Sequence, residues 1–381
     1  MNEIAFVCRA WGEASRAAEP AWLATVVGVE GSSYRRPGAR LLFGREAVLA
    51  GAVSGGCLER ELGLTGPWLT RNGPVIKIFD SRAEDERAPG TGCEGKVHVL
   101  VEPLSAVSDG ALSLIGRELA EENRVVLVTV LDTDLPGVPV GARLVKTHRR
   151  LTSQVPNLEL LRDLTGLASA ALAETELTAR RLSFCGTTIL LELLEPPPHL
   201  FVFGAGADAV PVVRMAALLG WTVTVCGATA HVATRERFVK LARVSEGSLD
   251  EDIALLERSA RPLAVVMAHD YRADRRALAA LLGTKAAYVG VLGPAHRTHR
   301  MLEEIERDGR GPVATGRARV FGPAGLALGA ETAEEIALSM LAEAQAVLAE
   351  TEPVFLSERS GTIHARGAPD PSDRDWVAKA K

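Results

Sequence analysis

Short apolar runs alternate with helical segments between residues 200 and 292, and this rhythm constrains the fold more than any other feature of the sequence. Runs that are apolar at almost every position are typical of strands buried on both faces of a sheet. Four such runs are present: Leu200–Phe203, Thr222–Cys226, Pro262–Ala268 and Ala286–Leu292. Strands that alternate with helices form a parallel sheet with right-handed crossovers. The sequence therefore predicts an α/β fold with a Rossmann-like, doubly wound parallel-sheet domain.

The first of these strands leads into a G-x-G-x-x-A turn at Gly204, Gly206 and Ala209. Such a turn lets a phosphate approach the backbone, and the helix that follows offers it free amides and a positive dipole end. Two details count against a standard dinucleotide site. Asp208 places a negative charge where a pyrophosphate would lie, and Val225-Cys226-Gly227 stands where an acidic residue would hold the ribose. Both NAD(P) binding and a domain that binds no dinucleotide therefore stay open.

His269 follows the third strand of this domain, at the carboxyl edge where doubly wound sheets bind ligands. Its imidazole is expected either to fix a loop by hydrogen bonds or to act as a proton carrier or ligand contact facing the inter-domain cleft. One enzyme hypothesis follows from this position. It is an NAD(P)-dependent oxidoreductase that acts on a small substrate at His269.

A capping box marks the last helix of this domain. Thr332 and Glu335 are spaced so that each accepts a hydrogen bond from a free amide at the start of a helix. The helix is expected to bury five apolar side chains: Ile336, Met340, Leu341, Ala344 and Leu348.

Residues 1–194 show a mixed pattern of short strands and helices and are expected to form an α+β domain with glycine-rich loops. No internal repeat is evident in them. A run of three prolines makes residues 195–199 a stiff linker. The Rossmann-like domain is expected to cover residues 200–350, and residues 351–381 to form a C-terminal tail.

Cysteines stand in two glycine-rich loops of the N-terminal domain. Ser54-Gly55-Gly56-Cys57 precedes a predicted helix, and Gly92-Cys93-Glu94-Gly95 precedes a predicted strand. A helix N-terminus lowers the pKa of a thiol, so Cys57 is a candidate nucleophile, carrier of persulfide sulfur or soft metal ligand. The cysteines form no C-x-x-C pair, which argues against a structural zinc site.

A third glycine-rich loop is basic. Residues 31–45 contain no acidic residue and four arginines, which are Arg35, Arg36, Arg40 and Arg45. Guanidinium groups in a glycine-rich loop suit a phosphate or another anion, although a solvated charged turn has the same composition.

Composition excludes several classes of protein. The 381 residues carry a net charge of −5, without the basic surplus of a general nucleic-acid binder. No apolar run is long enough to span a bilayer, and the N-terminal residues lack the pattern of a signal peptide. The five cysteines are widely spaced, and two of them, Cys8 and Cys226, lie in apolar patterns typical of a core. A cytoplasmic protein is expected.

In these motifs the chain resembles the XdhC/CoxI family, accessory proteins of molybdenum hydroxylases such as xanthine dehydrogenase and carbon monoxide dehydrogenase. The resemblance rests on an ordered set of motifs: Gly31-Ser32-Ser33-Tyr34-Arg35-Arg36-Pro37-Gly38, Ser54-Gly55-Gly56-Cys57-Leu58-Glu59, Gly92-Cys93-Glu94-Gly95-Lys96-Val97, Val101-Glu102-Pro103, Phe203-Gly204-Ala205-Gly206-Ala207-Asp208, Val266-Met267-Ala268-His269-Asp270-Tyr271, Tyr288-Val289-Gly290-Val291-Leu292-Gly293, and residues 322–337.

The resemblance implies a homodimeric factor that binds molybdenum cofactor, supports its sulfuration with a cysteine desulfurase and delivers it to an apo molybdenum hydroxylase. It implies a non-catalytic role, and no catalytic residue is assigned. Arg35, Arg36 and Arg40 are expected to hold the cofactor phosphate, while Cys57 is expected to contact the molybdenum or its sulfur. The residues expected at the cofactor are Arg35, Arg36, Arg40, Ser54, Gly55, Gly56, Cys57, Glu59, Cys93, Gly204, Gly206, Asp208 and His269. A sulfurtransferase that carries persulfide on Cys57 is a second enzyme hypothesis.

This chain departs from the family pattern at Glu94, Ala207 and Gly227, where the family commonly has glycine, histidine and an acidic residue. The change at Gly227 weakens the expectation of a nucleotide role for the second domain.

Overall fold

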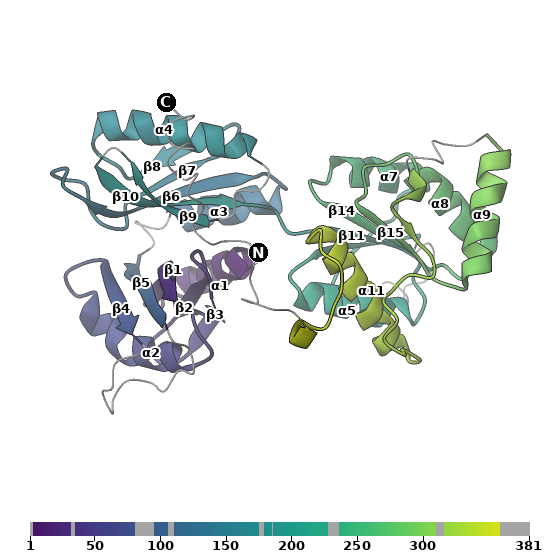
Figure 1. Cartoon of the computed structure of the whole chain (residues 1–381), viewed down its shortest axis with the longest axis horizontal. Coiled ribbons are helices and arrows are strands. Elements are labelled where there is room, and N and C mark those ends of the chain that lie inside the picture. The colour runs from purple at the N-terminus through teal and green to yellow at the C-terminus, as the bar shows by residue number, and fades with distance from the viewer. Residues whose placement is uncertain are drawn as a thin grey trace. The chain divides into compact units, whose positions relative to one another are not determined.

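The computed structural model describes residues 3–31, 35–80, 95–105, 110–174, 179–184, 186–227, 236–309 and 316–358. The chain divides into two units between Pro196 and Pro197, within the proline run (Figure 1). Among the described residues, the first unit contains two five-stranded antiparallel sheets and the second contains one six-stranded parallel sheet. No helix in the described ranges has the length and apolar character that crossing a membrane requires.

The first half of the first unit is a helix, three strands, a helix and two strands. Its elements are α1 (Glu3–Arg16), β1 (Ala21–Gly31), β2 (Arg40–Phe43), β3 (Val48–Gly51), α2 (Cys57–Leu69), β4 (Val75–Asp80) and β5 (Gly95–Leu104). The strands pair in the order β3-β2-β1-β5-β4. Helix α1 buries Ile4, Val7, Cys8 and Trp11 on one face, as predicted.

The second half runs through the same sequence of elements. These are α3 (Gly110–Ala120), β6 (Val125–Thr133), β7 (Arg143–Lys146), β8 (Leu151–Ser153), α4 (Leu158–Ala173), β9 (Ala179–Phe184) and β10 (Thr187–Leu194). The strands pair in the order β8-β7-β6-β10-β9. This is the order of the first sheet, with β6 to β10 in the places of β1 to β5.

The first unit is therefore an internal repeat, and the expectation that the chain contains none is wrong. The registers agree residue by residue: Thr25 of β1 lies opposite Arg40 and Leu100, while Thr129 of β6 lies opposite Arg143 and Leu190. Only short fragments repeat in the sequence, such as Gly-Ala-Arg-Leu at residues 38–41 and 141–144. Because strand pairing depends on the alternation of buried residues rather than on their identity, the repeat is clear only in the fold.

Two reciprocal ion pairs join the halves. Arg40 of β2 donates to the Glu192 carboxylate of β10, with N–O distances of 3.0 and 2.6 Å, and Arg143 of β7 donates to Glu102 of β5. All four side chains are buried. Burial lowers the pKa of Arg40, but Glu192, and to a smaller extent Glu102, raise it above its ordinary value. Since each pair links equivalent strands of opposite halves, the halves pack about an approximate two-fold axis.

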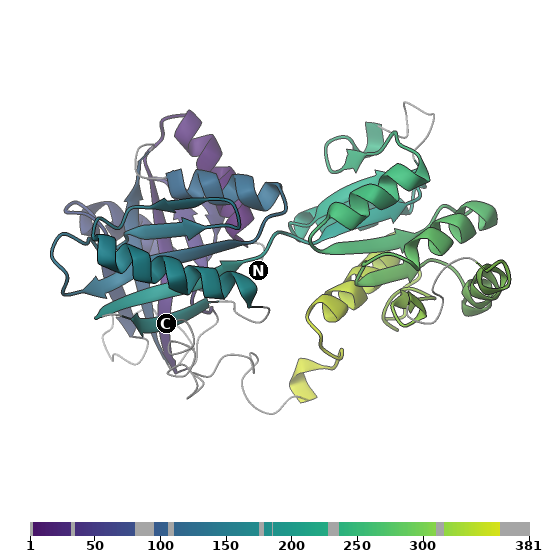
Figure 2. The same cartoon turned by 90° about the horizontal axis from the view of Figure 1, so that it is seen from above.

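The faces of the two sheets are covered symmetrically. Helix α2 packs on the first sheet and helix α4 on the second, while α1 and α3 share a core with residues of both sheets. Figure 2 shows α4, in teal, lying over the strands of the second half. The prediction of an α+β domain with glycine-rich loops is confirmed.

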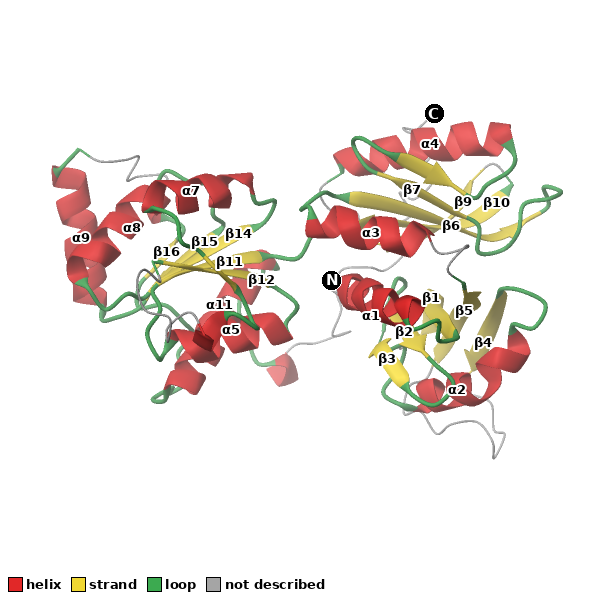
Figure 3. Cartoon of the chain, turned by 180° about the vertical axis from the view of Figure 1, so that it is seen from behind, coloured by secondary structure: helices red, strands yellow, loops and turns green. Residues whose placement is uncertain are grey.

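The second unit is a Rossmann-like domain, as predicted. Its strands are β11 (His199–Phe203), β12 (Thr222–Cys226), β13 (Arg243–Val244), β14 (Pro262–Val266), β15 (Tyr288–Val291) and β16 (Val320–Phe321), in the order β13-β12-β11-β14-β15-β16. Its helices are α5 (Ala209–Leu218), α7 (Leu249–Arg258), α8 (Tyr271–Leu281), α9 (Ala295–Arg307) and α11 (Ala333–Leu348), followed by the 3-10 turn η1 (Leu356–Glu358). Helices α5 and α11 cover one face of the sheet and α7, α8 and α9 the other (Figure 3).

Helix α11 begins at the predicted capping box, where Thr332 Oγ1 accepts from the Glu335 amide at 3.2 Å. Its buried face differs slightly from the prediction. Ala337 and Ser339 are buried, whereas Ile336 and Leu348 are only partly buried. Ala337 belongs to the apolar core that α11 shares with the sheet and α5, and the Ser339 hydroxyl donates to the Leu326 carbonyl at 2.6 Å.

Candidate functional site

The cysteine loop between β3 and α2 is held by one carboxylate. Glu59 Oε1 accepts hydrogen bonds from the amides of Val53 (2.9 Å) and Ser54 (2.6 Å), and Oε2 accepts from the amide of Gly56 (2.9 Å). The Ser54 hydroxyl also donates to Glu59 and accepts from the Leu58 amide. Three predicted site residues, Ser54, Gly56 and Glu59, are thus brought together, and the backbone of Cys57 begins helix α2.

The second half of the repeat provides an internal comparison for this loop. There, the equivalent helix α4 has an ordinary cap, because Asn157 Oδ1 accepts from the Leu160 amide at 2.9 Å. In the first half the capping position is Gly56, with φ +124°, which has no side chain to cap the helix. The amides at the start of α2 are therefore bound by Glu59, from inside the helix, and by Ser54.

The hydrogen bonds of Glu59 make the loop dependent on pH. Partial burial raises the pKa of this carboxyl, but the bonds from Ser54, from the amide of Glu59 itself and from Val53 outweigh it and hold the pKa below its ordinary value. The bonds therefore stabilise the loop above the unfolded pKa of about 4.3, and this contribution is lost as pH falls through the lower folded value. We expect the amide resonances of Ser54 and Gly56 to titrate with a midpoint below pH ~4.3. Glu59→Gln should abolish the titration, and a midpoint above that value in the wild type would contradict the assignment.

Arg35 joins the basic loop to the cysteine loop. Its Nε donates to the Ala52 carbonyl at 2.9 Å, and its Nη2 forms an ion pair with Glu3. The same Glu3 carboxylate accepts from the Ala52 amide at 3.1 Å. Sequence reasoning missed Glu3, since a single acid at the start of an amphipathic helix carries no signal of a loop contact.

Arg36 differs from Arg35 and Arg40 in its contacts. Its side chain is half-buried, and burial lowers the pKa of its guanidinium. No carboxylate or carbonyl among the described residues accepts from this guanidinium. A half-buried cation of this kind is suited to bind an anion.

Arg40 is not part of this arrangement. Its guanidinium lies in the buried ion pair with Glu192 and also donates to the Gly38 carbonyl at 2.8 Å. The sequence pattern placed it with Arg35 and Arg36, but alternation along β2 turns its side chain to the interface between the halves. Its charge is therefore already used inside the protein and is not available to a cofactor phosphate.

Cys93 lies outside the described residues. Residues 81–94 join β4 to β5, whereas residues 185 and 186 alone join the equivalent strands β9 and β10. The first half thus carries an insertion, with Cys93 in it, where the second half has a tight turn. Cys8 and Cys226 are buried, as expected for core residues, and burial raises the pKa of the Cys8 thiol to about 12.

A second group of predicted residues meets in the Rossmann-like unit. The strand order reverses between β11 and β14, and at this switch point Asp208 Oδ2 lies 2.5 Å from His269 Nε2. Asp208 makes no side-chain cap on α5, so its carboxylate faces the imidazole instead of the helix amides. A Cβ atom at Gly206 would lie 2.5 Å from Asp208 Oδ1, which shows how closely the carboxylate covers the turn.

His269 is held in an uncommon backbone conformation, with φ +59°. The residues on both sides are fixed: the Ala268 amide donates to Asp274 at 2.9 Å, and Asp270 accepts from the Ala273 amide at 2.7 Å. Asp274 is itself buried and paired with Arg297. The imidazole is 61% exposed, so it remains accessible to a ligand while its orientation is set by Asp208.

Two family models match this chain. The model described as the XdhC Rossmann domain matches residues 200–344, and the model described as the XdhC and CoxI family matches residues 5–70. The chain belongs to the XdhC and CoxI family. Together the two matches span more than half of the sequence and include both groups of predicted site residues except Cys93.

Two bacterial proteins are relatives of this XdhC and CoxI family member. A Bacillus subtilis protein described as a probable subunit of xanthine dehydrogenase is 29% identical over 331 residues, which cover 85% of this chain and 92% of that protein. The uncharacterized protein YqeB of Escherichia coli is 30% identical over 150 residues, 38% of this chain and 26% of its own length. A crystal structure of a Bacillus halodurans protein, described as a xanthine dehydrogenase, has the same fold: the TM-score is 0.70 at 23% identity, with 96% and 98% of the two chains covered.

Proposed function

We propose that this protein is a maturation factor that binds molybdenum cofactor at the loops of the first half and passes it to an apo molybdenum hydroxylase of the xanthine dehydrogenase type. The cofactor is cargo rather than a resident group. The family membership and the Bacillus subtilis relative, whose description links it to xanthine dehydrogenase, support this role. In this proposal a cysteine desulfurase supplies sulfur to the bound cofactor, and the protein works as a cytoplasmic homodimer without catalysing a reaction of its own.

The observation that carries the proposal is the junction between the basic loop and the cysteine loop. The bond from Arg35 Nε to the Ala52 carbonyl ties the loop that carries Arg36 to the segment that leads into α2. The cargo has matching chemistry, since it combines a terminal phosphate with a dithiolene and a soft metal. Arg36 suits the phosphate, and a thiol at the start of a helix suits the metal or its sulfur.

The proposal predicts which side chains the cargo needs. Under anaerobic conditions the wild type should bind molybdenum cofactor stoichiometrically and restore activity to an apo-hydroxylase. Arg36→Gln should weaken binding by about 10–100-fold, the loss expected for a hydrogen bond to a charged group. Cys57→Ala should bind weakly and fail to transfer. Arg45→Gln serves as the control, because Arg45 is an exposed arginine of the next connection, between β2 and β3.

Equal binding by the wild type, Arg36→Gln and Cys57→Ala would overturn the proposed site. A separate arm tests sulfuration: after incubation with a cysteine desulfurase, cyanide-releasable sulfur should be present in the wild type and absent in Cys57→Ala. Cyanide-releasable sulfur with repeated turnover but no cofactor binding would favour the sulfurtransferase hypothesis instead. Circular dichroism of each variant separates loss of binding from loss of folding.

A further inference from the structure

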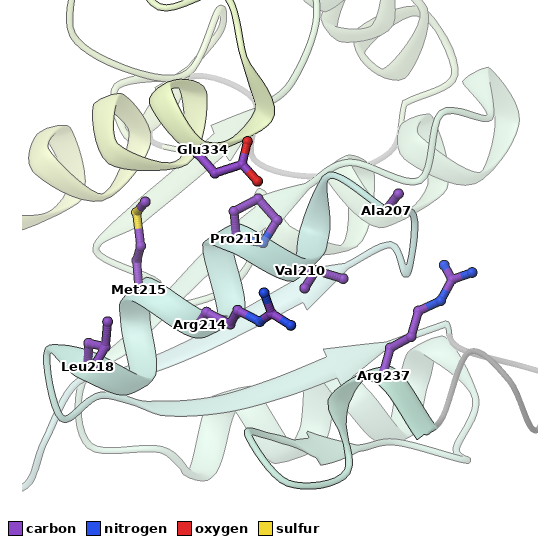
Figure 4. Close-up of a pocket in the computed structure, with 8 residues that line it drawn as sticks. All are labelled: Ala207, Val210, Pro211, Arg214, Met215, Leu218, Arg237 and Glu334. Atoms are coloured by element: carbon purple, nitrogen blue, oxygen red, sulfur yellow. The ribbon is translucent and has the colours of Figure 1, made fainter.

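A groove runs along helix α5 of the Rossmann-like unit, on the face of the sheet that α11 shares. Its volume is about 380 Å³, which lies in the range of small-molecule sites. Figure 4 shows its walls: Ala207, Val210, Pro211, Arg214, Met215, Leu218, Arg237 and Glu334. The groove begins beside the glycine turn, at Ala207, and follows one side of α5 towards its C-terminal end.

The groove combines an apolar wall with two cations. Val210, Pro211 and Met215 supply apolar surface, while Arg214 and Arg237 are exposed. No acceptor among the described residues contacts either guanidinium. Figure 4 shows Arg214 lying beside Val210 and Arg237 extending towards the turn that carries Ala207. Such a surface suits a ligand that has an anionic group at one end and a flat or apolar group at the other.

The anion does not belong at the glycine turn itself. In standard dinucleotide sites a phosphate lies at the amides that begin the helix. Here the Asp208 carboxylate lies over Gly206 and is held by His269 at 2.5 Å, so a phosphate at that position would meet a fixed negative charge. Arg214 instead lies on α5, more than one helical turn beyond Asp208, and Arg237 comes from a segment outside α5.

We propose that the groove binds a phosphate monoester carried on a flat heteroaromatic group, with Arg214 and Arg237 as the phosphate ligands and the apolar wall against the ring. Arginine forms paired hydrogen bonds to phosphate oxygens, which gives both affinity and orientation. Glu334 is the acid of the groove wall and weakens binding by repulsion. All residues of this site come from the second unit. A nucleotide and a pterin phosphate share the required chemistry.

Isothermal titration of the full-length protein with AMP tests the site. Arg214→Gln and Arg237→Gln should each raise the dissociation constant at least tenfold, and Glu334→Gln should lower it. Adenosine should bind at least tenfold more weakly than AMP. The matched control is Arg258→Gln, which removes an exposed arginine from α7 on the other face of the sheet and should change nothing.

Asp208→Asn separates the groove from the turn. If the phosphate binds in the groove, Asp208→Asn should change the affinity for AMP less than Arg214→Gln does. If Asp208→Asn instead raises the affinity by a larger factor than Arg214→Gln lowers it, the ligand binds at the turn and the proposal is overturned. Failure of AMP to bind at millimolar concentration, or equal binding by all variants, would also overturn it. Competition with isolated molybdopterin identifies the source: displacement of AMP assigns the groove to a pterin phosphate, and no displacement assigns it to a nucleotide.

Discussion

Glu192→Gln is expected to lower the free energy of unfolding of the first unit by about 3–5 kcal/mol, because it leaves the buried guanidinium of Arg40 without its charged partner. Both side chains are almost fully buried, at 4% and 2% exposed, so water cannot replace the lost carboxylate. Denaturant unfolding followed by hydrogen exchange in the first unit measures the effect.

The control for this variant lies a few residues away. Glu195 pairs with Arg124, but these side chains are 30% and 25% exposed, so Glu195→Gln should cost less than about 1 kcal/mol. The internal repeat adds a second comparison: Glu102→Gln should cost about as much as Glu192→Gln, because Glu102 makes the equivalent pair with Arg143. A small effect of Glu192→Gln, equal to that of Glu195→Gln, would show that the reciprocal pairs do not hold the halves together.

Gly204→Ala is expected to lower the stability of the Rossmann-like unit by about 2–6 kcal/mol. Overpacking costs about 1–3 kcal/mol and backbone strain costs about the same again. A Cβ atom at this position would lie 2.4 Å from the Met267 carbonyl oxygen. The backbone has φ +142°, a conformation that residues other than glycine rarely adopt. Hydrogen exchange of peptides from β11 and β14 measures the loss.

Gly227→Ala separates strain from overlap. Gly227 also has a positive φ, +72°, but no described residue lies within 4 Å of a Cβ atom there, so the cost should be about 1–2 kcal/mol from backbone strain alone. Equal losses of stability in the two variants would mean that the overlap with the Met267 carbonyl oxygen adds nothing to the cost of Gly204→Ala.

Local patterns predicted the second unit well. Thr222–Cys226 forms a strand with the predicted bounds, and the capping box at Thr332 begins a helix. These features depend on neighbouring residues in the chain: an apolar run buried on both faces of a sheet, or a hydroxyl and a carboxylate three residues apart. The cysteine loop before α2 was predictable for the same reason, because glycines and Ser54 lie next to the helix they precede.

Long-range pairing was not predictable in this way. Arg40 stands among loop arginines in the sequence, yet its partner Glu192 is 152 residues away. From the sequence, Asp208 was interpreted only as a negative charge unfavourable for phosphate binding at the glycine turn. The structure shows that it pairs with His269, 61 residues further along the chain. In both cases the partner of the charged side chain is determined by strand order and register.

The sequence by itself determined the two kinds of domain, the parallel strands of the second and the family to which the chain is similar, because alternation, capping and glycine turns are properties of short segments. The tertiary structure alone decided that the first unit is a repeat with buried reciprocal ion pairs, that the charge of Arg40 is paired inside the protein, and that Arg214 and Arg237 flank one groove. The physical reason is that burial and pairing of charges depend on residues brought together by folding, which no local pattern records.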